Sequence, residues 1–250
     1  MIGIFDSGAG GLTVLRAIKE EMPSSDIIYF GDIKHAPYGE RSRKELSELT
    51  VNAIRLLQKR GATSIVSACN SVSASLAVSL YDALALAPDR LIEMVGPTVS
   101  ALRSVDGILL AATPATIESG IYQNAFSLVG KDIATLPLAG LAGAIEFGRE
   151  QEVEEIIMKA FQNIQLGSYR VLVLACTHYP LALGAFRKAI GDSPIFDPAN
   201  AVAARVKTQL WPREVGEGKL QVVLSAENPA FRAHLSALNL DRGAMIEVLE

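Results

Sequence analysis

The chain has 250 residues, half of them apolar, and a formal net charge of −4, so it can bury a substantial core. The sequence shows no basic stripe to neutralise nucleic-acid phosphates and no apolar run of about 18 residues to span a membrane, so we expect neither partner. The first residues lack the charged segment of a signal peptide, and only two cysteines are present, which predicts a cytoplasmic protein without a structural disulfide.

Short apolar runs alternate with longer helical stretches along the chain. The expected strands cover 2–5, 26–31, 63–68 and 91–96, and the expected helices between them cover 11–22, 42–60 and 71–84. The pattern then starts again, with strands over 107–112, 132–138 and 170–175 and helices from about Pro114, over about 150–166 and from Pro180. The tail adds a strand and a helix within 219–238 and a last strand over 245–250. The strands are nearly continuous apolar runs, which predicts parallel α/β sheets covered on both faces.

The restart indicates an internal repeat. Aligning "SIVSACNS" (64–71) with "VLVLACTH" (171–178) places Cys69 on Cys176, 107 positions later. Each cysteine then follows the third strand of its half, at the carboxyl end of the sheet, where parallel α/β sheets bind ligands. The tail could return to the first sheet and make the first domain discontinuous.

The two cysteines have a plain interpretation and a functional one. Free cysteine is often a small buried apolar residue. Matching positions beside Asn70 and Ser71 in one half and Thr177 and His178 in the other favour chemistry instead. A helix that begins there would favour the thiolate form. A redox pair is disfavoured, because the sequence has no C-x-x-C.

A glycine-rich turn, "FDSGAGGLTVL" (5–15), follows the first expected strand. Its glycines do not fit G-x-G-x-x-G and no G-K-[ST] follows, so dinucleotide and P-loop phosphate sites are disfavoured. Asp6 or Ser7 could simply cap the next helix. A carboxylate at the end of a strand could also orient a proton beside a thiol, and we favour that role for Asp6.

The remaining polar candidates are less specific. The loop "GDIKHAPYGERS" (31–42) could offer backbone N–H groups to an anion, and we expect His35 in solvent or in a turn. Periodicity alone predicts an exposed helical position for Glu146. The three histidines and scattered acids do not form a metal-site pattern, so no metal is expected.

Five motifs in this order resemble the motif set of the bacterial glutamate racemases, in the aspartate/glutamate racemase superfamily: "GIFDSGAGGLTVL", "YFGDIKHAPYGERS", "SACNSVSAS", "ATPATIESGIY" and "LACTHYPL". The resemblance runs from residue 2 to about 200 and weakly into "SAENPAF" (225–231). It implies an α/β fold of two pseudo-symmetric parallel-sheet domains that face each other with the active site between them. We expect residues 1–96 plus 207–250 in the first domain and 97–206 in the second.

The resemblance implies a cofactor-independent racemisation of glutamate in which two cysteines flank the α-carbon. One thiolate removes the α-proton from one face, and the other thiol delivers a proton to the opposite face. Cys69 matches the base for D-glutamate and Cys176 the base for L-glutamate. Asp6 matches a carboxylate near the first cysteine, His178 an imidazole near the second, and Glu146 a glutamate that assists the second side.

The resemblance also implies a set of substrate contacts, to which Asp6 and His178 belong as well. The polar groups that match those holding the amino and carboxylate groups of the substrate are Ser7, Asn70, Ser71 and Thr177. The loop that matches the one over the substrate carboxylates contains Pro37, Tyr38 and Gly39. Thr113 and Thr116 match the second half's counterpart of the glycine-rich turn.

No pyridoxal phosphate or nucleotide is expected, because no lysine follows a strand where a Schiff base would form. The resemblance further implies a homodimer, and a D-glutamate product that feeds peptidoglycan precursors. Two alternatives stay open. One is a racemase of the same superfamily acting on aspartate or another amino acid, and the other is an inactive relative that serves as a binding or regulatory module.

Overall fold

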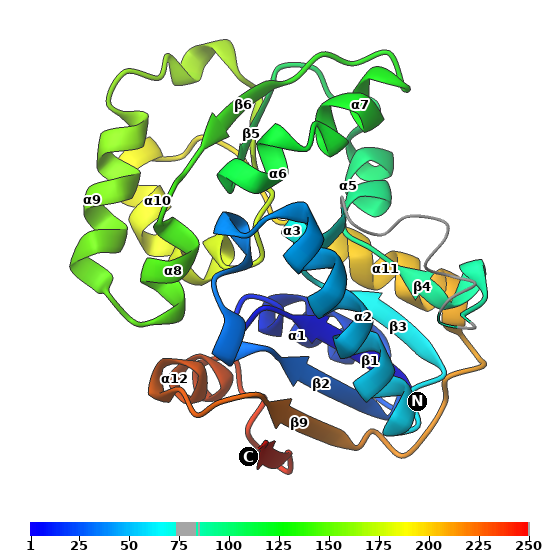
Figure 1. Ribbon diagram of the computed structural model, residues 1–250. Helices are drawn as coiled ribbons and strands as arrows, with labels where there is room; N and C mark the ends of the chain where they lie inside the picture. Colours follow the sequence, from blue (N-terminus) through cyan, green and yellow to red (C-terminus); the bar gives the residue numbers. More distant parts are fainter. Residues whose placement is uncertain (74–83, 85, 250) are drawn as a thin grey trace.

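The computed structural model describes residues 1–73, 84 and 86–249. Two parallel sheets each form the centre of a lobe (Figure 1). The first sheet has the order β10-β9-β2-β1-β3-β4, with β1 (Ile2–Asp6), β2 (Ile27–Gly31), β3 (Ser64–Ser67), β4 (Leu91–Ile92), β9 (Leu220–Leu224) and β10 (Met245–Val248). The second has the order β6-β5-β7-β8, with β5 (Ile108–Ala112), β6 (Ala134–Pro137), β7 (Val171–Leu174) and β8 (Ile195–Phe196).

The second sheet repeats four strands of the first. The order β2-β1-β3-β4 recurs as β6-β5-β7-β8, with all the pairings parallel. The repeat expected from the two cysteines is therefore confirmed, as is the α/β fold of two facing parallel-sheet domains. The return of the tail to the first sheet is also confirmed, because β9 pairs with β2 and β10 pairs with β9.

The helices divide between the two lobes. Those of the first lobe are α1 (Leu12–Glu21), α2 (Arg43–Lys59), α3 (Asn70–Ser73), α11 (Ala199–Leu210) and α12 (Pro229–Ala237). Those of the second are α5 (Val95–Leu102), α6 (Pro114–Glu118), α7 (Ile121–Ser127), α8 (Leu141–Glu146), α9 (Glu150–Phe161) and α10 (Leu183–Ile190). Short 3-10 turns cover Ile33–His35, Tyr38–Glu40, Pro88–Arg90, Leu166–Ser168 and Tyr179–Ala182.

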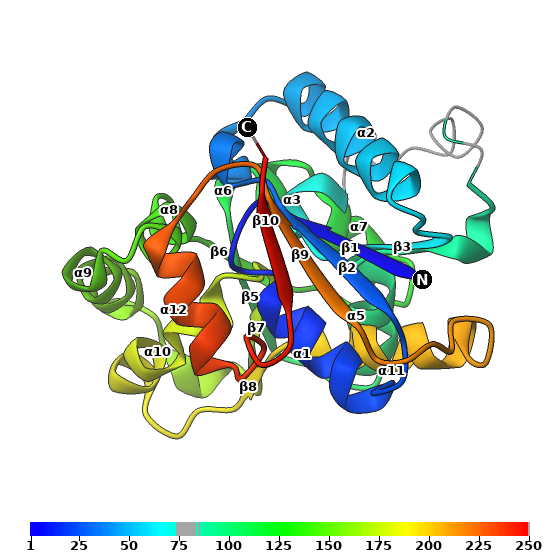
Figure 2. The ribbon, with the colours of Figure 1, turned by 90° about the horizontal axis from the view of Figure 1, so that it is seen from below.

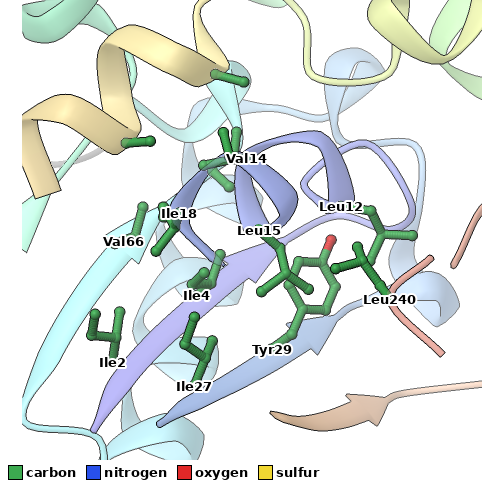
Figure 3. Packing of buried hydrophobic residues seen from close by; sticks show 14 of the residues in the cluster. Ile2, Ile4, Leu12, Val14, Leu15, Ile18, Ile27, Tyr29, Val66 and Leu240 are labelled. Carbon is green, nitrogen blue, oxygen red and sulfur yellow. The ribbon is translucent and has the colours of Figure 1, made fainter. Parts of the chain in front are cut away.

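The first sheet is covered on both faces, as its continuous apolar strands predict. Ile4 lies in the same cluster as Leu15 and Ile18, which point from α1 toward the sheet (Figure 3). The next residue, Phe5, points to the opposite face and packs in the cluster that contains α2. Complete burial of one such side chain contributes about 1.5–3 kcal/mol to the free energy of unfolding. These two layers hold the strand ends, and hence the site, in fixed positions.

The structure corrects several expected elements. The strand expected over 91–96 ends at Ile92, because the Glu93 carboxylate accepts hydrogen bonds from Val95 N and Gly96 N and starts α5 there. The helix expected over 150–166 ends at Phe161. The helix expected over 71–84 lies mostly outside the described residues. Three further elements, α8, β8 and α11, are absent from the expected set.

The two chain crossings between the lobes lie near α5 and α11. The limits expected at 96/97 and 206/207 fall inside these helices. The buried side chains of α11, among them Val202 and Val206, pack in the core of the first lobe. We therefore propose that the chain returns to the first lobe before Ala199. In the part of the chain that the structure describes, no helix is both long and apolar enough to cross a membrane.

Candidate active site

The two cysteines lie where the carboxyl ends of the two sheets meet. Cys69 follows β3 and Cys176 follows β7, and the residues are 5% and 6% exposed. Burial raises the pKa of the Cys69 thiol well above its ordinary value, and the charges of Asp6 and Cys176 raise it further. Both thiols are therefore buried at the junction of the two lobes.

Asp6 is the last residue of β1, and it is wholly buried. Its Oδ2 accepts hydrogen bonds from the backbone N–H groups of Gly8 and Gly11, at 3.2 and 2.9 Å. Its Oδ1 accepts one from the Thr177 hydroxyl of the second lobe, at 3.2 Å. Burial raises the pKa of Asp6, although the charge of His178 and the two N–H groups oppose this. A carboxyl group with a raised pKa can bind and release a proton beside the thiols.

A chain of polar contacts leads to Cys176. Glu146 Oε2 lies 2.6 Å from His178 Nε2 and accepts a hydrogen bond from the Ala9 N–H at 2.7 Å. His178 Nδ1 lies 3.9 Å from Cys176 Sγ. An ionised carboxylate only accepts hydrogen bonds, so a neutral His178 carries its proton on Nε2 and presents the Nδ1 lone pair to the thiol. This arrangement lets the imidazole take the thiol proton and leave a thiolate.

The electrostatics of His178 support this direction of proton transfer. Burial alone lowers the pKa of His178, but hydrogen bonds to Cys176 and Glu146 and the charges of both outweigh it. The pKa of the imidazole therefore stands well above its ordinary value. The raised pKa favours the protonated form of His178, which lies between Glu146 and Cys176.

Two glycines of the first lobe allow it to pack closely against Glu146 and His178. A Cβ atom at Gly8 would lie 2.1 Å from Glu146 Oε2, and one at Gly10 would lie 2.6 Å from His178 Nδ1. Only a residue without a side chain fits at these distances. The glycine-rich turn thus works as a close contact between the lobes, and its place at the end of β1 sets the position of both polar groups.

Hydroxyl groups from both lobes gather on the Cys69 side. Ser71 Oγ lies 3.2 Å from Thr113 Oγ1 and 3.4 Å from Thr116 Oγ1, and the two threonine Oγ1 atoms are 3.0 Å apart. Thr113 also caps α6 by accepting a hydrogen bond from the Thr116 N–H. The buried cluster offers several groups that can donate or accept, as a bound carboxylate or ammonium group requires.

The loop over Pro37, Tyr38 and Gly39 borders the same cluster. The Tyr38 hydroxyl donates to Asp32 Oδ2 at 2.7 Å, and the Ala36–Pro37 peptide bond is cis. A Cβ atom at Gly39 would lie 2.7 Å from Thr113 Cβ, so this loop also contacts the second lobe directly.

The comparisons with known proteins agree with this geometry. A family profile described as Asp/Glu/Hydantoin racemase matches residues 3–206. The chain belongs to the Asp/Glu/hydantoin racemase family. Glutamate racemase from Paracoccus denitrificans is 32% identical over 248 residues, covering 91% of this chain and 92% of the relative. Glutamate racemase from Clostridium perfringens strain 13 is 36% identical over 217 residues, covering 84% and 82%.

Solved racemases of the family share the whole fold. Glutamate racemase from Francisella tularensis, in complex with D-glutamate, superposes with a TM-score of 0.87 at 26% identity and covers 100% of this chain and 97% of its own. The enzyme from Aquifex pyrophilus gives a TM-score of 0.81 at 28% identity, covering 99% and 97%. Together with the sequence relatives, these matches identify the chain as an amino-acid racemase.

The structure brings together most of the residues that the resemblance to the family singled out. Asp6, Ser7, Asn70 and Thr177 are all buried at the junction of the lobes. Asn70 accepts a hydrogen bond from the Tyr122 hydroxyl at 2.6 Å. The roles of these residues in substrate binding stay predictions.

Two local expectations need correction. Glu146 is wholly buried, so the exposed position predicted from periodicity is wrong. The reason is that α8 ends against the glycine-rich turn of the other lobe, a contact that periodicity within α8 cannot reveal. Asp6 and Ser7 do not occupy the N-cap of α1, which is Gly11, but Asp6 binds the N–H of that cap residue.

Other features of the site add detail or were missed. His35 lies in a 3-10 turn, as expected, and its Nδ1 is 2.8 Å from Asp32 Oδ1. Asn228 was missed, although its amide contacts Glu146. The "NP" step before α12 signals a helix start, but no local pattern signals that contact. In the described residues, no group of three or more histidine, cysteine or acidic side chains could hold a metal.

Proposed function

We propose that this racemase interconverts L- and D-glutamate by a two-base mechanism with Cys176 and Cys69 and without a cofactor. The observation that carries the proposal is the pair of buried thiols, one after the third strand of each repeated half, with His178 Nδ1 3.9 Å from the Cys176 sulfur and the charge of Asp6 acting on Cys69. The identity of the relatives as glutamate racemases, and the D-glutamate bound to the Francisella tularensis relative, support glutamate as the substrate.

For L-glutamate, the Cys176 thiolate removes the α-proton while His178 holds the proton taken from the thiol. The negative charge then develops on the α-carbon and its carboxylate, which the hydroxyl and amide groups of the site stabilise. The Cys69 thiol delivers its proton to the opposite face of the planar carbon, with Asp6 nearby to restore it. The D-enantiomer reacts through the same steps in reverse.

Proton removal by an isolated thiol would be slow. A free thiol has a pKa of about 8.5, so only a few per cent is ionised at neutral pH. An amino-acid α-proton is far less acidic than that thiol. Holding the base against the α-carbon in a dry pocket replaces a bimolecular encounter by a positioned transfer.

The first experiment follows the ellipticity of L-glutamate by circular dichroism in deuterated buffer. We expect the signal to decay to zero, with deuterium entering the α-position of the product enantiomer. Turnover of aspartate but not glutamate would favour the alternative substrate within the family. No turnover of any free amino acid at high protein concentration would favour the binding or regulatory module.

A second experiment assigns each thiol to one face, using L- and D-3-chloroglutamate. Elimination of the α-proton and chloride needs one base only, and hydrolysis of the resulting enamine releases 2-oxoglutarate and ammonia. Cys69→Ser should lose racemisation and keep elimination from the L-form, whereas Cys176→Ser should keep elimination from the D-form. The reverse pattern would refute the facial assignment, and wild-type racemisation by both variants would refute the two-base mechanism.

The cellular setting follows from the same proposal. D-Glutamate made in the cytoplasm would supply peptidoglycan precursors, and we propose a homodimer as the working state. Analytical ultracentrifugation of the purified protein tests the dimer. Growth of a D-glutamate auxotroph expressing the gene tests the supply of D-glutamate.

A further inference from the structure

The side chain of Asn228 both caps the start of α12 and donates hydrogen bonds to Glu146. Its Oδ1 accepts hydrogen bonds from Ala230 N at 2.9 Å and Phe231 N at 3.4 Å. Its Nδ2 donates to Glu146 O at 2.9 Å and Glu146 Oε1 at 3.0 Å. Backbone N–H groups can only donate, so the amide oxygen must face them and the amide nitrogen must face Glu146. The helix cap therefore fixes the direction of the second contact.

This contact sets the orientation of the Glu146 carboxylate. Asn228 holds Oε1, while Ala9 N–H and His178 Nε2 bind Oε2 at 2.7 and 2.6 Å. With donors on both oxygens, the carboxylate plane cannot rotate without breaking a buried hydrogen bond. A fixed plane in turn keeps the Nε2 proton of His178 in place and its Nδ1 toward Cys176.

The contact also joins the two lobes. Asn228 lies between β9 and α12 in the first lobe, whereas Glu146 ends α8 in the second. Both ribbon views show α12 beside the second lobe near α8 (Figures 1 and 2). The first lobe therefore supplies donors to both oxygens of the Glu146 carboxylate, through Ala9 N–H and Asn228 Nδ2.

We infer that Asn228 is a positioning residue for the base that acts on the L-enantiomer, an inference that rests on the proposed function. It acts through Glu146 and His178 on Cys176, and within the described residues its side chain bonds to Glu146 and to the N–H groups of α12 rather than to Cys69. The prediction is therefore one-sided: disturbing Asn228 should weaken proton removal by Cys176 and spare proton removal by Cys69.

Two substitutions of Asn228 keep its capping of α12 while removing its hydrogen bond to Glu146. Asn228→Asp keeps the size and the cap oxygen but places a carboxylate oxygen against Glu146 Oε1. Asn228→Ser keeps a good N-cap but is too short to reach Glu146. Both variants should keep α12, and Asn228→Asp should show the larger loss because like charges then face each other in a buried place.

The test measures elimination from L- and D-3-chloroglutamate. We expect kcat/KM for the L-form to fall about 10–100-fold in Asn228→Ser and further in Asn228→Asp, with the D-form unchanged within about twofold. Racemisation itself must lose kcat/KM equally in both directions, because its equilibrium constant is one. Its asymmetry should instead appear as a larger α-deuterium isotope effect from L-glutamate than from D-glutamate.

The matched control is Arg232→Ala, on the same helix. Its guanidinium pairs with Glu227 at 2.9 Å on the surface, so its loss should change neither elimination reaction. Equal losses for both enantiomers in Asn228→Ser, or no loss for either, would overturn the positioning role. Failure of the proposed function would look different, because the wild-type protein would then eliminate neither enantiomer. Thermal melting shows whether each variant is folded, and either variant alone decides the one-sided prediction.

Discussion

Substituting Gly10 by alanine tests whether the two lobes stay in the observed contact during turnover. A Cβ atom at Gly10 would lie 2.6 Å from His178 Nδ1, 2.7 Å from His178 N and 2.7 Å from Thr177 Oγ1. Ordinary contact begins at 3.4 Å, so the shortest of these distances is too small by about 0.8 Å. One of the three atoms is backbone, and the others belong to buried side chains, so rotating a single side chain cannot relieve the overlap.

The expected consequence is a displacement of the segment after β7 relative to the glycine-rich turn by roughly 1 Å. A displacement of that size at a positioned base costs about a hundredfold in rate. The overpacking itself should lower the free energy of unfolding by about 1–3 kcal/mol, which leaves a folded protein. Gly10→Ala should therefore lose far more activity than its loss of stability explains.

The assays are racemisation of L-glutamate by circular dichroism and unfolding in urea. The matched control is Gly184→Ala, because a Cβ atom there meets no other atom within 4 Å and the residue lies inside α10. Because Gly184 lies in the first turn of α10, this control should change stability by less than about 1 kcal/mol and keep its activity. Wild-type kcat/KM in Gly10→Ala would show that the lobes do not hold this contact when the enzyme turns over.

Two further substitutions address the burial of single polar groups. Asp6→Asn should stabilise the protein while lowering racemisation. Burial raises the pKa of Asp6 above 3.8 in the folded state, so the wild type loses stability as the pH rises through the folded-state pKa. Asparagine does not ionise, so the variant avoids this loss. Urea titrations should show the advantage of the variant growing as the pH rises above about 4, and an advantage independent of pH would contradict this. Tyr122→Phe removes the hydroxyl that donates to Asn70 Oδ1, so the free energy of unfolding should fall by about 1–3 kcal/mol and the KM for glutamate should rise. An unchanged KM would separate Asn70 from substrate binding.

Local sequence patterns predicted the order of the elements well. The apolar runs that became β1, β5 and β7 are nearly continuous, because strands covered on both faces have no polar side, whereas β3 has a serine at each end. The two cysteines could be placed at strand ends because each follows such a run directly. The resemblance of five motifs to the glutamate racemases then supplied roles that the residue types alone could not.

Short elements and their limits were harder to predict. The run after Ile92 is apolar enough to continue as a strand, yet the carboxylate of Glu93 turns it into the start of α5. Helix α8 is only six residues long, which is too short for a periodic pattern to reveal its buried face.

The contacts across the two lobes were decided by the tertiary structure alone. Glu146 meets Ala9 and Asn228, which are 137 and 82 positions away in the chain, and Asp6 meets Thr177 at a separation of 171. Helical and strand periodicities report which side of an element is buried, but not what lies on that side. The sequence by itself therefore determined two repeated halves, each with a thiol at the end of a strand. How the halves dock determined which polar groups surround each thiol, because that docking depends on the packing of whole lobes.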